Sequence, residues 1–85
     1  MNEILFSQRA NKELKKLDAK TLKRVCREIT CLEANPFYGE RLHGELNGFY
    51  KLKIPPLRII YSYNKKEKCI QIFALGYRGD IYKGL

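Results

Sequence analysis

Four cations and one tyrosine in the second half of the chain are the residues best suited to chemistry: Lys51, Lys53, Arg58, Arg78 and Tyr82. The sequence has no P-loop, no C-x-x-C zinc pattern and no nucleophile motif that pairs serine or cysteine with histidine. A cationic cluster can hold a phosphate, because arginine offers a planar fork to its oxygens and lysine a point charge. Crowded cations also favour a neutral lysine, which can act as a general base, and tyrosine can exchange a proton in the same field.

RNA is a substrate that such a set can cleave, because RNA carries its own nucleophile, the 2′-hydroxyl. The reaction needs a base for that hydroxyl, stabilisation of the charged phosphorane and a proton donor for the leaving 5′ oxygen. The five residues can supply all three functions without a cofactor or a metal ion. The five residues are therefore candidates for a metal-independent cleavage of RNA.

The charge distribution of the chain fits a polyanionic partner. The 85 residues, which we expect to form one domain (1–85), carry 17 Lys and Arg against 9 Asp and Glu, a net charge of +8. Two basic blocks, 8–28 and 48–68, flank a neutral-to-acidic connector. Nucleic acid or an acidic protein would suit this surface, and so would a solvated surface with no specific ligand. Without a signal peptide or a membrane-spanning run, we expect a cytoplasmic protein.

The apolar pattern predicts two helices after a short strand at residues 2–6. Ser7 and Asp18 are candidate N-caps, and Asn35-Pro36 should end the second helix, which closes a helical hairpin over 8–34. The apolar positions at helical spacing are Ala10, Leu14 and Leu17, followed by Leu22, Val25, Cys26, Ile29 and Leu32.

Beyond a connector at residues 35–48 the pattern changes to strands. In "FYKLKI", Leu52 and Ile54 alternate with Lys51 and Lys53. Pro55-Pro56 forces a turn, and "LRIIYSY" and "CIQIFAL" are two further strands. The prediction is an α+β domain of order β-α-α-β-β-β, with a three-stranded antiparallel meander in a twisted sheet and a short C-terminal tail. The helical hairpin should cover one face, which leaves the lysines on the open face.

The three cysteines, Cys26, Cys31 and Cys69, form no disulfide framework by number or spacing. We expect all three to be small buried apolar residues. Tyr50 and Tyr61, like Tyr63, are expected to pack in the core or against the sheet rather than to stack on bases.

The ordered motifs of the chain resemble those of the RelE/ParE superfamily of bacterial and archaeal toxins. The resemblance covers nearly the whole chain and lies in "RLHGELNGFYKLKI", "LRIIYSY" and "IFALGYRGDIYKGL". The matching residues are Leu42, Gly44, Leu46, Gly48, Tyr50, Lys51, Lys53, Arg58, Ile59, Ile60, Tyr61, Gly76, Arg78 and Tyr82. It implies the toxin half of a type II toxin–antitoxin pair, with a cognate antitoxin as partner and operator DNA contacted only through the antitoxin complex.

RelE-like members cleave messenger RNA in the ribosomal A site by 2′-hydroxyl attack, without a metal. ParE-like members keep the fold, lack the catalytic cations and poison DNA gyrase. By position, Lys51 and Lys53 match the paired lysines that serve as base and phosphate ligand, and Arg58 matches the phosphate-holding arginine. Arg78 matches the arginine that stabilises the transition state and protonates or orients the leaving group, and Tyr82 matches the late tyrosine that stacks on a base or transfers a proton. This set favours the RelE branch, with the ParE branch as the alternative.

The chain departs from the family pattern at three places, one of which is a short gap from Arg78 to Tyr82 that leaves the placement of the tyrosine open. Many members have glycine-histidine-arginine where this chain has Gly76-Tyr77-Arg78, so branches with a catalytic histidine are not the template. The turn before Arg58 is Pro55-Pro56-Leu57, where a glycine and then an aromatic residue are common, and this changes how Arg58 is aimed.

Structural roles remain open for the same residues. Lys51 and Lys53 also fit a solvated strand face, Arg58 a salt bridge within the sheet, Arg78 a cap on the strand end and Tyr82 packing of the tail.

The helical cations have a second interpretation as an RNA-binding surface. This set is Lys12, Lys16, Lys20, Lys23, Arg24 and Arg27. In the family such a face would lie along ribosomal RNA, whereas in most proteins it is only solvated. In the connector, Glu45 is an alternative carboxylate base, and His43 is expected to form loop hydrogen bonds.

Overall fold

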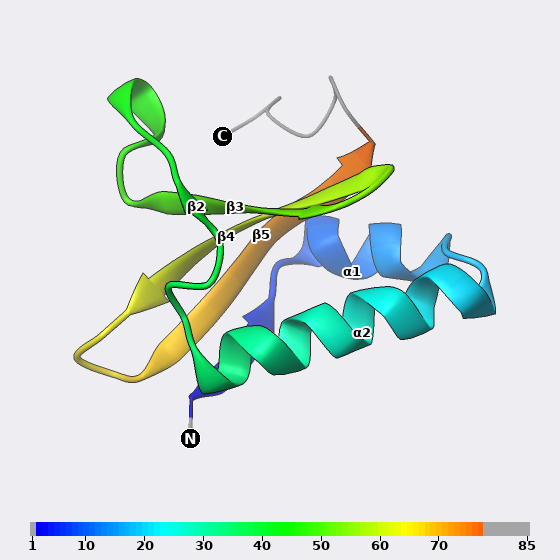
Figure 1. Ribbon diagram of the computed structural model, residues 1–85, viewed down its shortest axis with the longest axis horizontal. Coiled ribbons are helices and arrows are strands. Elements are labelled where there is room, and N and C mark those ends of the chain that lie inside the picture. The colour runs from blue at the N-terminus through cyan, green and yellow to red at the C-terminus, as the bar shows by residue number, and fades with distance from the viewer. Residues whose placement is uncertain (1, 78–85) are drawn as a thin grey trace.

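The computed structural model describes residues 2–77, and it has the predicted order of strands and helices (Figure 1). The elements are β1 (Glu3–Phe6), α1 (Gln8–Lys15), α2 (Ala19–Ala34), β2 (Glu40–Arg41), the 3₁₀ turn η1 (Gly44–Leu46), β3 (Phe49–Ile54), β4 (Leu57–Asn64) and β5 (Cys69–Tyr77). The sequence pattern missed β2 and η1, which both lie in the connector. Within this part of the chain, neither helix is long and apolar enough to cross a bilayer.

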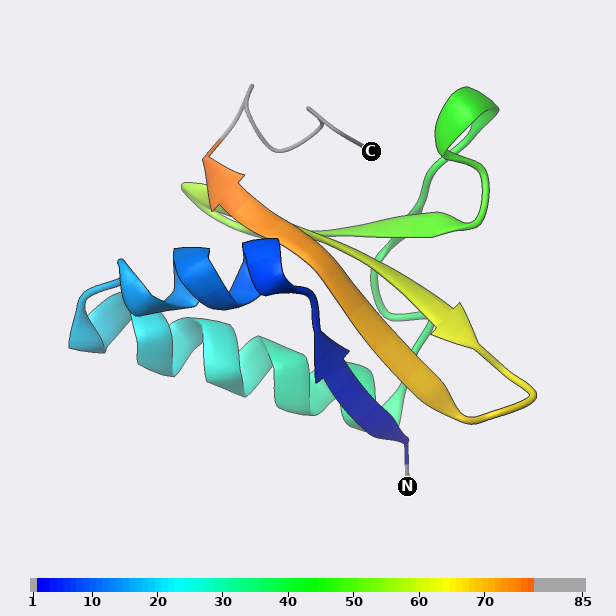
Figure 2. The same cartoon turned by 180° about the vertical axis from the view of Figure 1, so that it is seen from behind.

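The strands form one sheet in the order β1-β5-β4-β3-β2. The predicted antiparallel meander β3-β4-β5 is its centre, and one strand is added at each edge. On one side β1 pairs with β5 in parallel, and on the other β2 pairs with β3 antiparallel. Figure 2 shows β1 beside β5 at the edge away from β2.

Both helices begin where the sequence predicts. The Ser7 hydroxyl accepts a hydrogen bond from the Ala10 N–H at 3.0 Å and donates one to the Phe73 carbonyl at 2.6 Å, so one side chain caps α1 and ties it to β5. Asp18 occupies the N-cap of α2, and the pKa of its carboxyl is lowered, chiefly by a side-chain hydrogen bond with Thr21. At the other end of α2, Asn35 is extended, as expected before proline.

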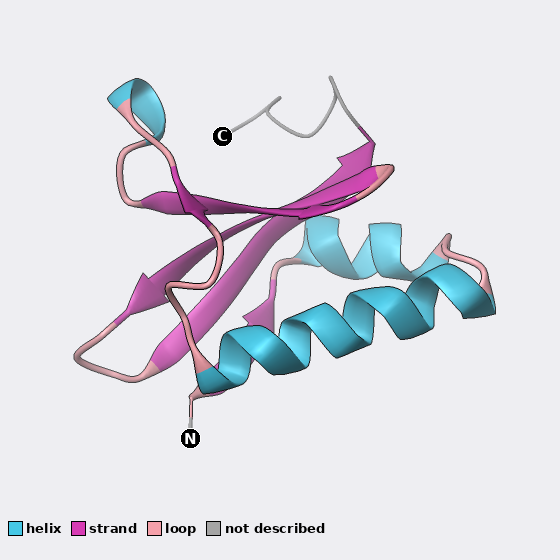
Figure 3. Cartoon of the chain, in the orientation of Figure 1, coloured by secondary structure: helices cyan, strands magenta, loops and turns pink. Residues whose placement is uncertain are grey.

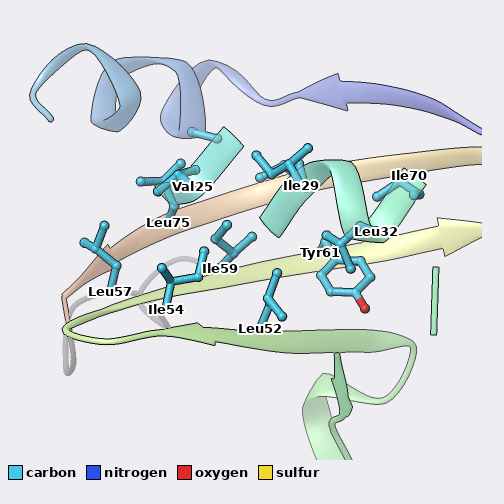
Figure 4. Close-up of a cluster of buried hydrophobic side chains, with 12 residues drawn as sticks. Val25, Ile29, Leu32, Leu52, Ile54, Leu57, Ile59, Tyr61, Ile70 and Leu75 are labelled. Atoms are coloured by element: carbon cyan, nitrogen blue, oxygen red, sulfur yellow. The ribbon is translucent and has the colours of Figure 1, made fainter. Parts of the chain in front are cut away.

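The two helices cover one face of the sheet (Figure 3). α2 buries Val25, Ile29 and Leu32, which recur at intervals of four and three residues along one stripe. They meet alternate side chains of the strands, among them Leu52, Ile54, Leu57, Ile59, Tyr61, Ile70, Ile72 and Leu75 (Figure 4). Each fully buried aliphatic side chain of this kind contributes about 1.5–3 kcal/mol, so this layer stabilises the sheet that carries the lysines.

The opposite face has a smaller apolar cluster of its own. Ile60 and Ala74 are fully buried there, with Leu42 and Phe49 packed against them. A β-bulge next to Ile60 leaves Phe73 without a partner in β4, and its ring meets that of Phe49 edge-on at 4.9 Å. This face is therefore partly apolar, and the lysines share it with a small hydrophobic cluster.

The prediction that all three cysteines are buried is wrong. Cys26 and Cys31 are exposed on α2, and Cys69 is partly exposed; all three are free. Each of the two helical cysteines lies next to a buried residue in sequence, Val25 or Leu32, about 100° away around the helix and therefore off the buried stripe. The pKa of the Cys69 thiol is raised by burial, with smaller contributions from the charges of Glu3 and Glu67.

The Tyr61 hydroxyl fixes the start of the connector to the sheet. It donates a hydrogen bond to the Pro36 carbonyl and accepts one from the Gly39 N–H, both at 2.9 Å. Gly39 lies so close that an added Cβ would be 2.6 Å from this hydroxyl and 2.9 Å from the Lys51 carbonyl. As predicted, Tyr61 is core and Tyr50 and Tyr63 pack against it, and the Tyr50 and Tyr61 rings stack at 5.2 Å.

We predict that Tyr61→Phe lowers the free energy of unfolding by about 1–3 kcal/mol, because it leaves the Pro36 carbonyl and the Gly39 N–H without their partner. The measurement is urea unfolding followed by circular dichroism. Tyr63→Phe is the matched control: it removes one partly buried bond to Asn2, and we expect it to cost about 0.5 kcal/mol. Equal losses in the two variants would contradict the anchoring role.

We also predict that this stabilisation depends on pH. Burial raises the pKa of Tyr61 to about 12, whereas the unfolded chain has the ordinary value near 10. The folded state therefore holds this proton more tightly, so the contribution is complete below about pH 10 and is lost as the pH rises towards 12. The difference in unfolding free energy between the wild type and Tyr61→Phe should narrow over this range, and a constant difference would contradict the prediction.

Candidate functional site

The candidate site lies on the sheet face opposite the helices. Leu52 and Ile54 of β3 are buried beneath α2, so the alternate residues Lys51 and Lys53 lie on the other face, as predicted. Lys53 is exposed and Lys51 is half-buried.

Strand register brings Arg58 to the same place. It is the direct cross-strand partner of Lys53, and on its other side it is opposite Gly76 of β5. Directly opposite side chains have their Cβ atoms about 4.5–5.5 Å apart, and two like charges in this position are destabilising unless something compensates them. Within residues 2–77 neither cation forms an ion pair with a carboxylate. The pair is therefore an arrangement that an anion would stabilise.

A surface hollow of about 290 Å³ lies beside this pair. Its lining is Lys53, Pro55, Pro56, Leu57 and Arg58. The lining thus combines the apolar residues of the turn with the two cations, a combination suited to a phosphate with an attached ring.

The turn between β3 and β4 is held in place by α2. An Arg24 guanidinium N–H donates a hydrogen bond of 2.8 Å to the Pro55 carbonyl. Arg24 was predicted to bind RNA, but here its guanidinium is engaged with the protein's own turn. Because Lys53 and Arg58 flank that turn, this hydrogen bond links α2 to the strand ends that carry the two cations.

Lys51 differs from Lys53 in having a counter-ion. Its Nζ lies 3.4 Å from a carboxylate oxygen of Glu40, and only 16% of the Lys51 side chain is exposed, against 62% for Glu40. The two residues are register partners between β2 and β3. The two lysines of the strand are therefore not equivalent.

The other predicted site residues are located as follows. Arg78 and Tyr82 lie outside the described residues. Lys12, Lys16, Lys20, Lys23, Arg24 and Arg27 are all exposed on the two helices. Of these, Lys16 pairs with Glu13 at 3.2 Å. His43 and Glu45 are exposed in the connector. The described residues contain no group of three or more His, Cys, Asp or Glu side chains placed to bind a metal ion.

Sequence reasoning missed two residues of the site, Glu40 and, in its positioning role, Arg24. Glu40 lies in a connector with no periodic pattern, and only the pairing of β2 with β3 brings it to Lys51. The contact of Arg24 spans 31 residues of sequence, so no local signal could have revealed it.

The fold and the cationic sheet face point to a class of small basic toxins, and the sequence comparison gives the family. A family model described as "ParE-like toxin of type II bacterial toxin-antitoxin system" matches residues 4–85. The chain belongs to this family, within the RelE/ParE superfamily that its motifs resemble. A search of curated proteins finds no match.

Solved structures with the same fold include toxins alone and in complexes. The chain is 23% identical to a chain of the toxin–antitoxin complex RelBE2 from Mycobacterium tuberculosis, with a TM-score of 0.82 and coverage of 91% of this chain and 98% of the other. The chain is 20% identical to the isolated E. coli RelE toxin, with a TM-score of 0.82 and coverage of 91% of this chain and 84% of that toxin. It is 26% identical to a chain of the archaeal RelE-RelB complex from Pyrococcus horikoshii OT3, with a TM-score of 0.76 and coverage of 92% of this chain and 96% of the other.

We predict that Arg24→Ala loosens the β3–β4 turn, because the Pro55 carbonyl loses its charged donor. A hydrogen bond of this kind contributes about 1.5 kcal/mol, so amide exchange at Ile54 and Leu57 should accelerate about tenfold. Hydrogen exchange followed by NMR measures this. Arg27→Ala, which removes another exposed arginine of α2, is the control and should leave both amides unchanged. Equal exchange in the two variants would show that Arg24 does not hold the turn.

Proposed function

We propose that the protein is a RelE-like toxin: a metal-independent endoribonuclease that cleaves messenger RNA in the ribosomal A site and so inhibits translation in the cytoplasm. The observation that carries the proposal is the direct opposition of Lys53 and Arg58 on the sheet face opposite the two helices. Two adjacent cations without a carboxylate partner in residues 2–77 favour an anionic ligand, and the phosphodiester of RNA is one with a built-in nucleophile.

In the proposed reaction the 2′-hydroxyl attacks the adjacent phosphorus. The P–O bond to the 5′ oxygen of the next nucleotide breaks, which leaves a 2′,3′-cyclic phosphate and a 5′-hydroxyl. Arg58 and one lysine of β3 hold the phosphate and stabilise its developing charge, and the other lysine of the pair Lys51 and Lys53 supplies the base. The family resemblance assigns transition-state stabilisation to Arg78 and stacking or proton transfer to Tyr82. One of these two residues, which both lie outside the described part of the chain, would donate the proton to the leaving 5′ oxygen.

The exposed cations of α1 and α2 would add affinity without chemistry. A surface hollow along α1, lined by Gln8, Arg9, Lys12, Glu13, Lys15 and Lys16, shows where such side chains gather. We propose that this basic surface contacts ribosomal RNA. Each phosphate contact would contribute salt-dependent affinity.

We further propose that a cognate antitoxin keeps the protein silent. Two of the structures with the same fold are toxin–antitoxin complexes, which supports such a partner. An acidic, amphipathic antitoxin segment would suit the +8 charge of the chain. Operator DNA would then be contacted only through the antitoxin complex.

The alternative is a gyrase poison without nuclease activity, which the ParE-like description of the family favours. The two functions differ in what the cationic face does. A nuclease needs Lys53 and Arg58 at the reacting phosphate, whereas a gyrase poison needs no chemistry from them.

The deciding experiment is primer extension on a defined messenger in a purified translation system. We predict discrete cuts within translated codons for the wild type, and at least about a 100-fold slower cleavage for Lys53→Ala and for Arg58→Ala, because each removes charge stabilisation from the phosphorane. Arg78→Ala should behave in the same way.

Lys65→Ala is the matched control, since this exposed lysine lies in the turn at the other end of β4 and should cut like the wild type. An intact messenger in the presence of the wild type would refute the proposal, and a supercoiling assay with DNA gyrase would then test the alternative. Cleavage that survives in both Lys53→Ala and Arg58→Ala would leave a nuclease with its site elsewhere.

A further inference from the structure

The Lys51–Glu40 ion pair has a role that neither the family nor the motif suggests. Lys51 is the more buried lysine of β3, and its ammonium lies 3.4 Å from the Glu40 carboxylate. Lys53, two residues further along the same face, has no such partner in residues 2–77. Among residues 2–77, one site therefore contains a lysine paired with a carboxylate beside a lysine and an arginine that have no carboxylate partner.

The backbone of Glu40 is placed beside Lys51 by the fold, through strand register. Residues 36–39 are held to the sheet by the Tyr61 hydroxyl, and Gly39 lies directly against the backbone of Lys51. The next residue, Glu40, enters β2 and pairs in register with Lys51. Because the connector is held to the sheet in this way, the Glu40 carboxylate lies within ion-pair distance of Lys51.

We propose that Glu40 is a built-in counter-ion of the site: it holds the Lys51 ammonium against β2, so that an RNA phosphate meets Lys53 and Arg58 first and recruits Lys51 only by displacing Glu40. This inference rests on the proposed nuclease function for its RNA part, and on geometry alone for the pairing. The carboxylate and the phosphate compete for the Lys51 ammonium, so Glu40 weakens RNA binding. When no RNA is bound, Glu40 reduces the positive charge of the site.

The pairing itself is tested without RNA. An amine-acylating reagent is added to the folded protein, and the modification of each lysine is followed by peptide mass spectrometry. In the wild type, Lys51 should react several-fold more slowly than Lys53. In Glu40→Gln, Lys51 should react at least about threefold faster while Lys53 is unchanged, since the substitution keeps the side-chain shape and removes the charge.

Glu45→Gln is the matched control, because it removes one exposed negative charge from the same connector. It should leave the reactivity of Lys51 unchanged. Thermal unfolding midpoints of the two variants should agree, which separates loss of the pair from loss of the fold. Equal Lys51 reactivity in the wild type and Glu40→Gln would overturn the pairing.

The RNA part is tested by binding to a short single-stranded RNA whose 2′-hydroxyls are methylated, so that it cannot be cut. Glu40→Gln should bind about threefold more tightly than Glu45→Gln at low salt, with a steeper dependence of log K on log salt by up to about 0.7, the value for one further phosphate contact. Identical affinity and slope in the two variants would overturn the competition.

The two proposals fail in different ways. If the wild type cuts messenger RNA but the two glutamine variants match in lysine reactivity and RNA binding, the nuclease stands and the counter-ion role falls. If messenger RNA stays intact while Glu40→Gln still exposes Lys51 to the reagent, the nuclease falls and the ion pair stands. If the wild type does not bind the methylated RNA, the competition falls.

Discussion

The buried hydroxyl of Tyr61 is the constraint on which the site depends. One oxygen atom joins a core residue of β4 to both ends of the segment Pro36–Gly39, because it donates to one and accepts from the other. That segment has no regular hydrogen-bond ladder of its own, so its course over the sheet depends on this hydroxyl together with the packing of Phe37 against Tyr50 and Tyr63. The core thereby determines where the connector enters β2, and with it the charge that faces Lys51.

The two faces of the sheet differ in composition and in role. Towards the helices it is a continuous apolar layer, and the resulting burial supplies most of the stability. Towards the other side it has a small apolar cluster around Ile60 and Ala74, and Lys53 opposite Arg58 nearer the turn. Opposed like charges are tolerated there because the apolar layer beneath stabilises the strands in their register. Packing on the helix-covered face thus offsets the repulsion between Lys53 and Arg58.

The parts of the fold with a strong local period could be predicted from the sequence. The helical stripe of α2 and the alternation of β3 specified their elements, and the alternation put Lys51 and Lys53 on the correct face. The cysteines were misjudged because an apolar side chain next to the stripe resembles one within it. The ion pair of Glu40 and the hydrogen bond of Arg24 to Pro55 escaped prediction for another reason. Glu40 reaches Lys51 through a two-residue strand, and Arg24 contacts a segment far away in sequence, and neither kind of contact produces a periodic pattern.

The parallel pairing of β1 with β5 has a consequence for the order in which the protein is made. β1 is synthesised first, yet its strand partner is residues 69–72, so this edge of the sheet closes one of the longest loops in the structure. Contacts of such high sequence separation form late, because the entropy of loop closure must be overcome first. A nascent chain can build its helices early but cannot close the sheet until β5 has been translated. Assembly of the described sheet is therefore delayed until the ribosome has produced β5.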